Sequence, residues 1–359
     1  MNGRRKIMEL STAQQKIVEA KEPKIVVVAS AAAGKTTVLT QRVKYLLSHG
    51  ADPTKVVMIT FTNAAAEEMA ERLGHPKGIF IGTIHSYANY LLLAHGKDTS
   101  DLLETEQFDR LFERIKKHPN CIKEVDYLML DESQDSTEQQ FEFLLDMVRP
   151  KNYMLVGDWR QSIYRWASAY PDYLINLAHD PTVTTYDLNE NYRNGYKILD
   201  FARGIINAAG YEYYDRSRPM RGVSGKVIDV EYSPVAVARA IKSMGDYKNW
   251  FVLTRTNDQL DEMAFFLKKE GIPIDTFKRS ELDNKELGEK MKQDTVKVLT
   301  IHTAKGLEAN NVVVIGAKFF NIEERCVSYV AATRAKNLLV WTKMPNKKRM
   351  TQQMTSWER

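Results

Sequence analysis

Cysteine is almost absent from this chain, since Cys121 and Cys326 are the only two among 359 residues. Two thiols cannot build a disulfide framework or a cysteine-based zinc site, and such scarcity is typical of a reducing compartment. The sequence also lacks any apolar run of the roughly 20 residues that a membrane-spanning helix needs. Residues 1–10 are basic but contain no apolar stretch of the kind found in a signal peptide. We therefore expect a cytoplasmic protein without a membrane anchor.

A strong excess of one charge is missing as well. The 51 basic and 46 acidic residues give a formal net charge of +5, which suits a polyanionic partner without requiring one. With 43% hydrophobic and 27% charged residues, the composition is that of an ordinary globular protein. The length allows two domains of typical size.

Two series of apolar, strand-like runs alternate with helix-like segments. The first series comprises residues 25–28, 56–60, 127–130 and 153–156; the second comprises residues 250–253, 296–301, 312–315 and 338–341. This alternation is typical of α/β proteins with parallel sheets. We expect two such domains, 1–179 and 180–359, divided at the polar stretch around His179, Asp180 and Pro181.

A phosphate-binding loop is indicated where residues 25–28 lead into the segment 29–36 and then into the helical pattern 37–47. In such loops the lysine reaches the β and γ oxygens and the hydroxyl binds Mg²⁺, roles that fall here to Lys35 and Thr36. Ala29 stands at the first glycine position, so the strict pattern is not met. An alanine-rich helix start with an incidental Gly-Lys-Thr is the alternative interpretation.

An acidic pair, Asp131 and Glu132, directly follows the apolar run 127–130. The carboxyl edge of a buried parallel strand is where open α/β sheets bind ligands. There Asp131 is suited to hold Mg²⁺ and Glu132 to take a proton from an attacking water. A lone Asp-Glu pair is more often a solvated surface pair, and only its place after a strand favours catalysis. Together with the loop, the pair predicts hydrolysis of a nucleoside triphosphate.

Eight further motifs occur in order along nearly the whole chain. They occupy residues 10–14, 60–69, 82–86, 156–166, 191–193, 255–257, 302–308 and 329–335. The series resembles the motifs of the UvrD/Rep/PcrA-type helicases of superfamily 1, subfamily A, which move along single-stranded DNA using ATP. The resemblance implies two RecA-like domains with the ATP site in the cleft between them.

The resemblance also implies roles for single residues in binding and hydrolysing ATP with Mg²⁺. Gln14 would read the adenine edge, Tyr192 would stack on adenine, and Gln161 would sense the γ-phosphate. Arg193 and Arg334 would act as arginine fingers, although an isolated arginine is more often part of a surface salt bridge. The implied catalytic residues are Lys35, Asp131, Glu132, Gln161, Arg193 and Arg334. The implied ATP contacts are Gln14, Ala33, Gly34, Lys35, Thr36, Thr37, Arg42, Tyr192 and Glu308, with Thr36 and Asp131 as metal ligands.

A DNA track follows from the same motifs, with single-stranded DNA and single/double-strand junctions as partners. Aromatic residues would stack on bases and polar ones would contact the backbone, so that binding is independent of sequence. The implied DNA contacts are Phe61, Thr62, Asn63, Thr83, His85, Tyr164, Trp166 and His302. A lone Phe or Trp is more often a core residue, and His85 and His302 could be structural histidines.

The chain departs from the family pattern in its insertions. Only residues 87–124 are available for the first inserted domain, and residues 257–296 leave too little chain for the second. Ala167 and Cys326 each stand where the family usually has arginine. We therefore expect a monomeric motor core that moves 3′ to 5′, from a bacterial or virus-infected bacterial cell.

Two alternatives remain at this point. One is a DNA-stimulated translocase subunit that strips proteins from DNA or switches a nuclease or recombination partner, with little unwinding alone. The other is a binding protein that keeps the fold without hydrolysis, against which the intact catalytic set argues. The basic tail at residues 343–349 is interpreted as a solvated charged end.

Overall fold

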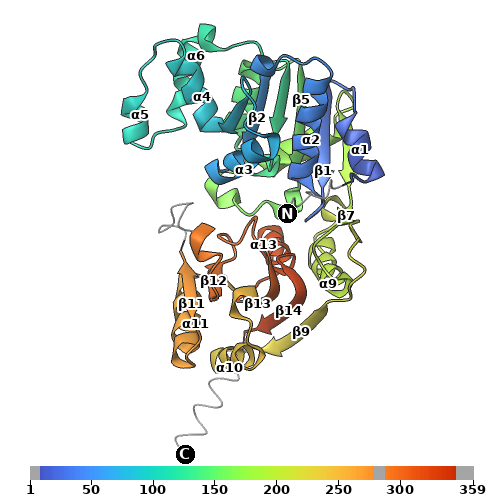
Figure 1. Ribbon diagram of the computed structural model, residues 1–359, viewed down its shortest axis with the longest axis vertical. Coiled ribbons are helices and arrows are strands. Elements are labelled where there is room, and N and C mark those ends of the chain that lie inside the picture. Colours follow the sequence, from blue (N-terminus) through green and yellow to red (C-terminus); the bar gives the residue numbers. More distant parts are fainter. Residues whose placement is uncertain (1–8, 279–287, 345–359) are drawn as a thin grey trace, which may run out of the picture. The chain divides into compact units, whose positions relative to one another are not determined.

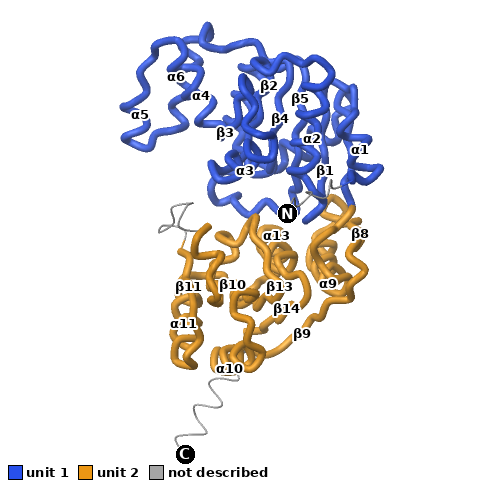
Figure 2. The backbone as a smooth tube through the Cα atoms, in the orientation of Figure 1, with its two compact units in different colours: residues 1–189 blue, residues 190–359 orange. Residues whose placement is uncertain are grey.

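The chain forms two compact units, residues 1–189 and 190–359, which Figure 2 shows in different colours. The structure is a computed structural model and describes residues 9–278 and 288–344. Within these residues each unit is built on a six-stranded parallel sheet, which confirms the predicted α/β class with two parallel-sheet domains. Most of the basic tail expected at residues 343–349 lies outside the described residues.

The sheet of unit 1 has the strand order β3-β2-β4-β5-β1-β6. Its strands are β1 (Lys24–Ala29), β2 (Val56–Thr60), β3 (Phe80–Thr83), β4 (Tyr127–Leu130), β5 (Asn152–Gly157) and β6 (Thr184–Leu188). Figure 1 labels β1, β2 and β5. Its helices are α1 (Thr12–Val18), α2 (Lys35–Ser48), α3 (Asn63–Leu73), α4 (Ile84–Leu93), α5 (Ser100–Glu104), α6 (Arg110–Lys117), α7 (Glu138–Phe141) and α8 (Pro171–His179). Successive residues of β1 and β2 are buried, as expected of strands covered on both faces.

The division between the units lies at Asn189 and Glu190, not at the expected boundary of residues 179 and 180. The cause is β6, which pairs in parallel with β1 and so completes the first sheet. Its sequence is Thr-Thr-Tyr-Asp-Leu, and only Leu188 is fully buried. An edge strand with so few apolar residues gives no hydrophobic signal in the sequence.

Residues 87–124, the expected remnant of an inserted domain, contain most of α4 together with α5 and α6. Helix α4 contacts β3, and Figure 2 shows α5 and α6 on the same side of unit 1. Helices α4 and α6 pack together, with His85 of α4 stacked on Phe112 of α6, and Phe112 also stacks on Phe143, which follows α7. This small helical cluster is thus attached to unit 1 by its own apolar contacts.

Unit 2 has the strand order β11-β12-β10-β13-β14-β9. The strands are β9 (Lys226–Glu231), β10 (Trp250–Thr254), β11 (Ile274–Phe277), β12 (Val296–Thr300), β13 (Ala309–Ile315) and β14 (Ala335–Lys343), with the short pair β7 (Glu190–Asn191) and β8 (Arg218–Pro219) beside them. The helices are α9 (Tyr196–Asn207), α10 (Pro234–Met244), α11 (Asn257–Lys269) and α13 (Ile322–Ala332). Trp250 and Leu267 lie in a core between the sheet and α10 and α11.

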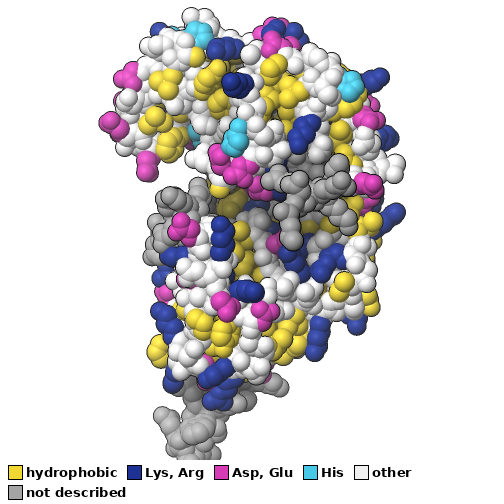
Figure 3. Space-filling model, in the orientation of Figure 1, with side chains coloured by type: hydrophobic (Ala, Val, Ile, Leu, Met, Phe, Trp, Pro, Cys, Tyr) yellow, Lys and Arg dark blue, Asp and Glu magenta, His cyan; other side chains and the backbone are white. Residues whose placement is uncertain are grey.

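Charged side chains of both signs are interspersed over the face of each unit seen in Figure 3, consistent with the small net charge. Over the described ranges, no helix combines the length and the apolar character that crossing a bilayer would take.

Candidate nucleotide site and nucleic-acid contacts

The phosphate loop has the predicted strand, loop and helix order. β1 ends at Ala29, and α2 begins at Lys35 directly after Gly34. Gly34 has a φ of 84°, in the left-handed region, and a Cβ there would lie 2.8 Å from Gln14 Nε2. This backbone conformation favours glycine, and any side chain here would also displace the Gln14 amide. Ala32 also adopts a positive φ, 58°, so the loop keeps its bend where an alanine replaces glycine.

The acidic pair lies beside this loop. Because β4, β5 and β1 are neighbouring parallel strands, the carboxyl ends of β4 and β1 meet at one edge of the sheet. Thr36 Oγ1 donates a hydrogen bond to Asp131 Oδ2 at 3.1 Å, and Lys35 Nζ lies 3.1 Å from Glu132 Oε2. The two residues of each predicted motif are thus paired across about a hundred positions of sequence.

Asp131 is buried and has one negatively and one positively charged neighbour. Burial and the negative charge of Glu132 raise the pKa of Asp131 to about 6, while the Lys35 charge opposes this shift. Glu132 has a φ of 50°, a strained conformation for a residue with a side chain. Two close carboxylates next to one lysine form a site that an additional cation would stabilise.

Gln14 and Arg42 connect α1 to the rest of the site. The Gln14 amide is engaged at both ends, since Oε1 accepts from Ser11 N and Nε2 donates to Ala33 O, each at 3.1 Å. Arg42 is buried and donates from Nη1 to Val18 O at 2.7 Å, while its Nε has no partner among the described residues. Gln14 thus holds α1 against the phosphate loop, and Arg42 holds α1 against α2.

A buried network that the sequence interpretation missed lies behind these groups. Gln134 Nε2 donates to Glu132 Oε2 at 2.6 Å, and Gln134 Oε1 accepts from Asp158 N at 2.9 Å. The two oxygens of Asp158 accept from Arg160 Nε at 2.6 Å and from Gln161 Nε2 at 2.7 Å. Asp158 therefore orients Gln161, the residue implied as the γ-phosphate sensor.

Arg160 extends this network to the phosphate loop. Its Nη2 donates to Ser30 Oγ at 3.2 Å, and its side chain is only 4% exposed. Hydrogen bonds thus run from Ser30 through Arg160, Asp158, Gln134 and Glu132 to Lys35, so both ends of the loop are tied to one network. A sequence signal did exist, because Asp158 and Arg160 are charged residues directly after the apolar strand β5.

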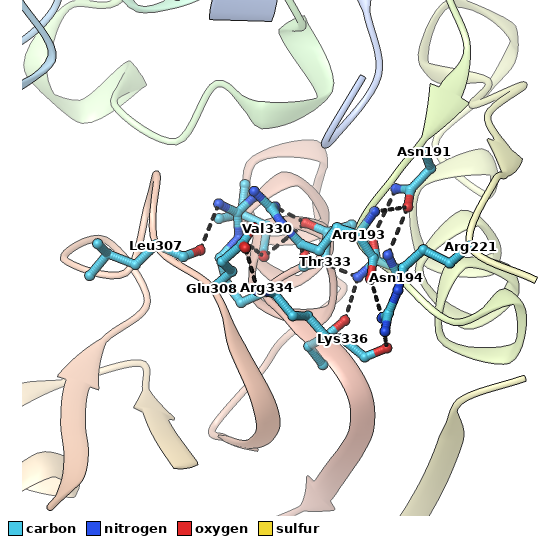
Figure 4. A network of polar contacts seen from close by, with 11 residues as sticks. Asn191, Arg193, Asn194, Arg221, Leu307, Glu308, Val330, Thr333, Arg334 and Lys336 are labelled. Carbon is cyan, nitrogen blue, oxygen red and sulfur yellow. Dashed lines mark hydrogen bonds and ion pairs between the residues drawn. The ribbon is translucent and has the colours of Figure 1, made fainter. Parts of the chain in front are cut away.

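In unit 2, three motifs that are far apart in sequence meet around Glu308, as Figure 4 shows. Arg193 Nε donates to Glu308 Oε2 at 2.5 Å, and Lys336 Nζ lies 2.5 Å from Glu308 Oε1. Arg193 Nη1 also donates to Thr333 O at 3.2 Å. Burial raises the pKa of Glu308, but the two cations outweigh burial and leave it below its ordinary value.

Arg334 is 2% exposed and donates hydrogen bonds within unit 2. It donates to Val330 O at 3.0 Å, to Leu307 O at 3.3 Å and to Thr333 Oγ1 at 3.2 Å (Figure 4). The structure thus brings Arg193, Glu308 and Arg334 together.

Tyr192 is 43% exposed, with its hydroxyl bonded to Glu190 Oε2 at 2.8 Å.

Two supporting residues of this second cluster were also missed from the sequence. Asn194 Nδ2 donates to Thr333 O at 3.1 Å and to Ala335 O at 2.5 Å. Arg221 Nη1 donates to the carbonyls of Arg193, at 2.6 Å, and of Lys336, at 3.0 Å. Their side chains satisfy backbone carbonyls, a role that has no signature in sequence.

The aromatic residues implied for DNA lie together in unit 1. Phe61 stacks on Tyr164, with ring centroids 5.4 Å apart and an interplanar angle of 13°. Trp166 lies edge-on to Tyr164 at 6.4 Å. Phe61 is 42% and Trp166 66% exposed, whereas Tyr164 is buried. The rings of Phe61 and Trp166 are therefore open to solvent, and the buried Tyr164 packs against both.

The polar residues of the implied DNA track have local structural tasks. Thr62 and Thr83 are the N-caps of α3 and α4, and Asn63 is the exposed first residue of α3. His85 Nε2 lies 2.9 Å from Asp109 Oδ1, and its ring stacks on Phe112. His302, in unit 2, follows β12 and is half-buried.

The fold and the loop define the P-loop class of nucleotide-binding proteins, with an acidic pair beside the loop. Comparison with known proteins narrows this class. The UvrD/REP helicase N-terminal domain matches residues 10–118 and 107–182, and the UvrD-like helicase C-terminal domain matches residues 274–346. The chain belongs to the UvrD/REP helicase family.

Three known relatives are about one quarter identical to this chain over the aligned residues. A "Probable DNA helicase" of Mycoplasma pneumoniae is 24% identical over 432 residues, which covers 88% of this chain and 79% of that protein. "ATP-dependent DNA helicase Rep" of Escherichia coli is 25% identical over 368 residues, covering 74% of this chain and 55% of that protein. "ATP-dependent DNA helicase PcrA" of Leuconostoc citreum is 25% identical over 374 residues, covering 74% and 49%. The chain thus spans about half the length of several curated relatives that it matches.

Proposed function

We propose that this protein is an ATP-driven DNA helicase that moves 3′ to 5′ along single-stranded DNA. The observation that carries the proposal is the pairing of Lys35 with Glu132 and of Thr36 with Asp131 at one sheet edge. In a chain of the UvrD/REP helicase family, this arrangement supplies a lysine for the phosphates, ligands for a metal ion and a base for the attacking water. Strand separation and direction rest on the names and motifs of the relatives.

In unit 1, ATP binds with its phosphates on the loop before α2. The backbone N–H groups and Lys35 hold the phosphates, and Glu132 takes the proton of the attacking water. Thr36 and Asp131 are suited to hold Mg²⁺, because the hydroxyl and carboxylate oxygens are hard ligands that lie 3.1 Å apart. The two carboxylates of the acidic pair also leave an excess of negative charge at this position. The ion supplies neutralisation of charge on the β and γ oxygens.

Arg193 and Arg334 of unit 2 complete the proposed reaction as arginine fingers for the γ-phosphate. Glu308 contacts the nucleotide near its ribose or γ-phosphate, and Tyr192 stacks on adenine. A guanidinium supplied to the transition state is worth roughly a thousandfold or more in rate. Hydrolysis would then require closure of the two units, which couples the reaction to movement along DNA.

The proposed partner is single-stranded DNA, including its junctions with duplex. The exposed faces of Phe61 and Trp166 support this, since stacking of a base on an aromatic ring is worth about 1–3 kcal/mol and reads no sequence. Thr62, Asn63, Thr83 and His85 would contact the DNA backbone from unit 1, and His302 from unit 2. The bacterial relatives support a cytoplasmic motor, which we propose to act as a monomer.

The test combines steady-state ATP hydrolysis, with and without single-stranded DNA, and displacement of a labelled strand from duplexes with a 3′ or a 5′ tail. We expect DNA to stimulate hydrolysis and displacement to occur on the 3′-tailed duplex alone. Displacement on the 5′-tailed duplex would contradict the direction. Stimulation without displacement would contradict helicase activity of the chain alone, and absence of hydrolysis would contradict the motor assignment.

A further inference from the structure

Asn194, directly after Arg193, is fully buried in unit 2, and its side-chain amide lies inside the network of Figure 4. Its Nδ2 donates to Thr333 O at 3.1 Å and to Ala335 O at 2.5 Å, and its Oδ1 accepts from Asn191 Nδ2 at 2.8 Å. A primary amide has two N–H donors, so these carbonyls occupy both. Because a carbonyl only accepts, the nitrogen must face this pair, which fixes the orientation of the amide.

The two carbonyls lie on either side of Arg334 in the chain. Thr333 is the C-cap of α13 and Ala335 begins β14, so Arg334 is the single residue between the helix cap and the strand. Asn194 therefore holds the backbone immediately before and immediately after this arginine. Anchoring both peptide groups restricts the backbone torsions of Arg334, on which the direction of its side chain depends.

Arg193 shares one of these anchors. Its Nη1 donates to Thr333 O at 3.2 Å, the same oxygen that accepts from Asn194. A carbonyl oxygen has two lone pairs, so Thr333 O holds both donors at once. Asn194 is thus joined to Arg193 through the peptide bond and to both neighbours of Arg334 through its amide. One buried side chain connects the two arginines.

The segment that carries Asn194 is itself firmly held. Gly195 N donates to Lys336 O at 2.9 Å, and Arg221 Nη1 donates to the same oxygen at 3.0 Å. A Cβ on Gly195 would lie 2.6 Å from the backbone of Gly225, so the two backbones are in close contact. The segment is therefore fixed between β14 and the chain before β9.

We propose that Asn194 is a positioning residue for ATP hydrolysis, which sets the placement of Arg193 relative to Arg334 through its bonds to the carbonyls on either side of Arg334. This inference rests on the proposed function, in which both arginines act on the γ-phosphate, and it gives Asn194 no contact with the nucleotide. Two guanidinium groups stabilise one transition state only when their geometry is preorganised. A misplacement of about 1 Å can cost about a hundredfold in rate.

The test separates the rate of hydrolysis from binding of ATP, in the full chain. Asn194→Asp keeps the shape of the amide but offers no N–H to the two carbonyls, and Asn194→Ser keeps one donor without adding a buried charge. We expect kcat to fall about tenfold to a hundredfold in both variants, with the KM for ATP within about twofold of wild type. ADP with aluminium fluoride, a mimic of the transition state, should bind more weakly by a similar factor, while a non-hydrolysable ATP analogue should bind normally.

A double-mutant cycle distinguishes positioning from a purely structural role. If Asn194 acts through the arginines, Asn194→Ser should lower kcat less when Arg193→Ala is already present. A structural role would lower the temperature of thermal unfolding and leave kcat unchanged at temperatures where the variant is folded. Thr342→Val is the matched control, because the buried Thr342 also donates to a backbone carbonyl of unit 2, that of Val314 at 2.9 Å, near the other end of β14.

The outcomes separate this inference from the proposed function. If the wild-type protein hydrolyses ATP, Arg193→Ala does not, and folded Asn194→Ser keeps the wild-type kcat, the role of Asn194 is refuted while the proposed function stands. An equal loss of kcat in Thr342→Val would also overturn it, since that would show a general effect of removing a buried donor. If the wild-type protein does not hydrolyse ATP, the proposed function fails first.

Discussion

Single side chains in this protein have tasks that depend on a few close partners. Glu132 illustrates this, because one of its oxygens meets both Lys35 Nζ at 3.1 Å and Gln134 Nε2 at 2.6 Å. Such partners hold a carboxylate in one orientation. A base that must be aimed at a water molecule benefits from this effect.

At this scale we expect Glu132→Gln to abolish ATP hydrolysis and to leave ATP binding largely intact. The glutamine keeps the shape of the side chain but cannot accept a proton, and general-base catalysis is typically worth 10²–10⁴-fold. Steady-state turnover and binding of a fluorescent ATP analogue measure the two effects. Glu68→Gln, at an exposed carboxylate of α3, is the control. Normal turnover in Glu132→Gln would rule out this residue as the base.

Trp166→Ala should weaken single-stranded DNA binding by at least about fivefold, the lower end for one stacked base. The indole is 66% exposed, so its removal costs little packing, and thermal stability should change little. Affinity for ATP should stay unchanged, because the aromatic cluster is separate from the phosphate loop. Unaltered DNA affinity, measured by anisotropy, would exclude Trp166 from the DNA track.

At the scale of elements, strand order decides which residues meet. The loop after β1 and the acidic pair after β4 are neighbours only because β5 alone lies between these strands. The turn after β5 supplies Asp158 and Arg160, which lie between the phosphate loop and the acidic pair. The three loops at this edge therefore act as one hydrogen-bonded structure.

Arg160→Ala should destabilise unit 1 and impair ATP binding together. Removal of one partner of a buried ion pair typically costs about 3–5 kcal/mol, because Asp158 would stay buried without its guanidinium. The loss of the bond to Ser30 should in addition raise the KM for ATP. Denaturant unfolding and ATPase kinetics measure both. Arg165→Ala, whose pair with Asp172 is more exposed, is the matched control and should cost less than about 1 kcal/mol. Equal costs in the two variants would refute the role of the network.

Gly34→Ala should abolish ATP binding with a smaller effect on the fold. The backbone would be strained at a φ of 84°, and the new Cβ would lie 2.8 Å from Gln14 Nε2, so either the Gln14 amide or the loop must shift. Gly50→Ala is the control for strain alone, because Gly50 has a φ of 88° and no atom within 4 Å of the added Cβ. Binding of ATP by Gly34→Ala at wild-type affinity would mean that the loop geometry is not essential.

At the scale of the whole molecule, the proposed reaction needs groups from both units. Unit 1 holds the phosphate loop and the acidic pair, and unit 2 holds Arg193, Glu308 and Arg334 around shared hydrogen bonds. Neither set is complete for phosphoryl transfer by itself. The family comparisons match both units, which supports a function that uses them together.

Arg193→Ala should therefore lower the kcat for ATP by roughly a thousandfold, while ATP binding on unit 1 is largely kept. Glu308 would retain Lys336 as a partner at 2.5 Å, so unit 2 should stay folded. Arg239→Ala, at an exposed arginine of α10, is the control. A loss of binding with unchanged kcat would place Arg193 outside the transition state.

The sequence by itself determined the central strands and the two nucleotide motifs. Predicted strands at residues 56–60 and 127–130 coincide with β2 and β4, since buried parallel strands are continuous apolar runs. Only the tertiary structure decided the edges and the long-range pairs. β6 is polar and half-exposed, and its assignment to unit 1 depends on pairing with β1. Arg193 and Glu308 meet across 115 positions, and the Phe319 ring stacks on Trp341. Such pairings follow from strand order and loop anchoring, which local hydrophobic pattern does not encode.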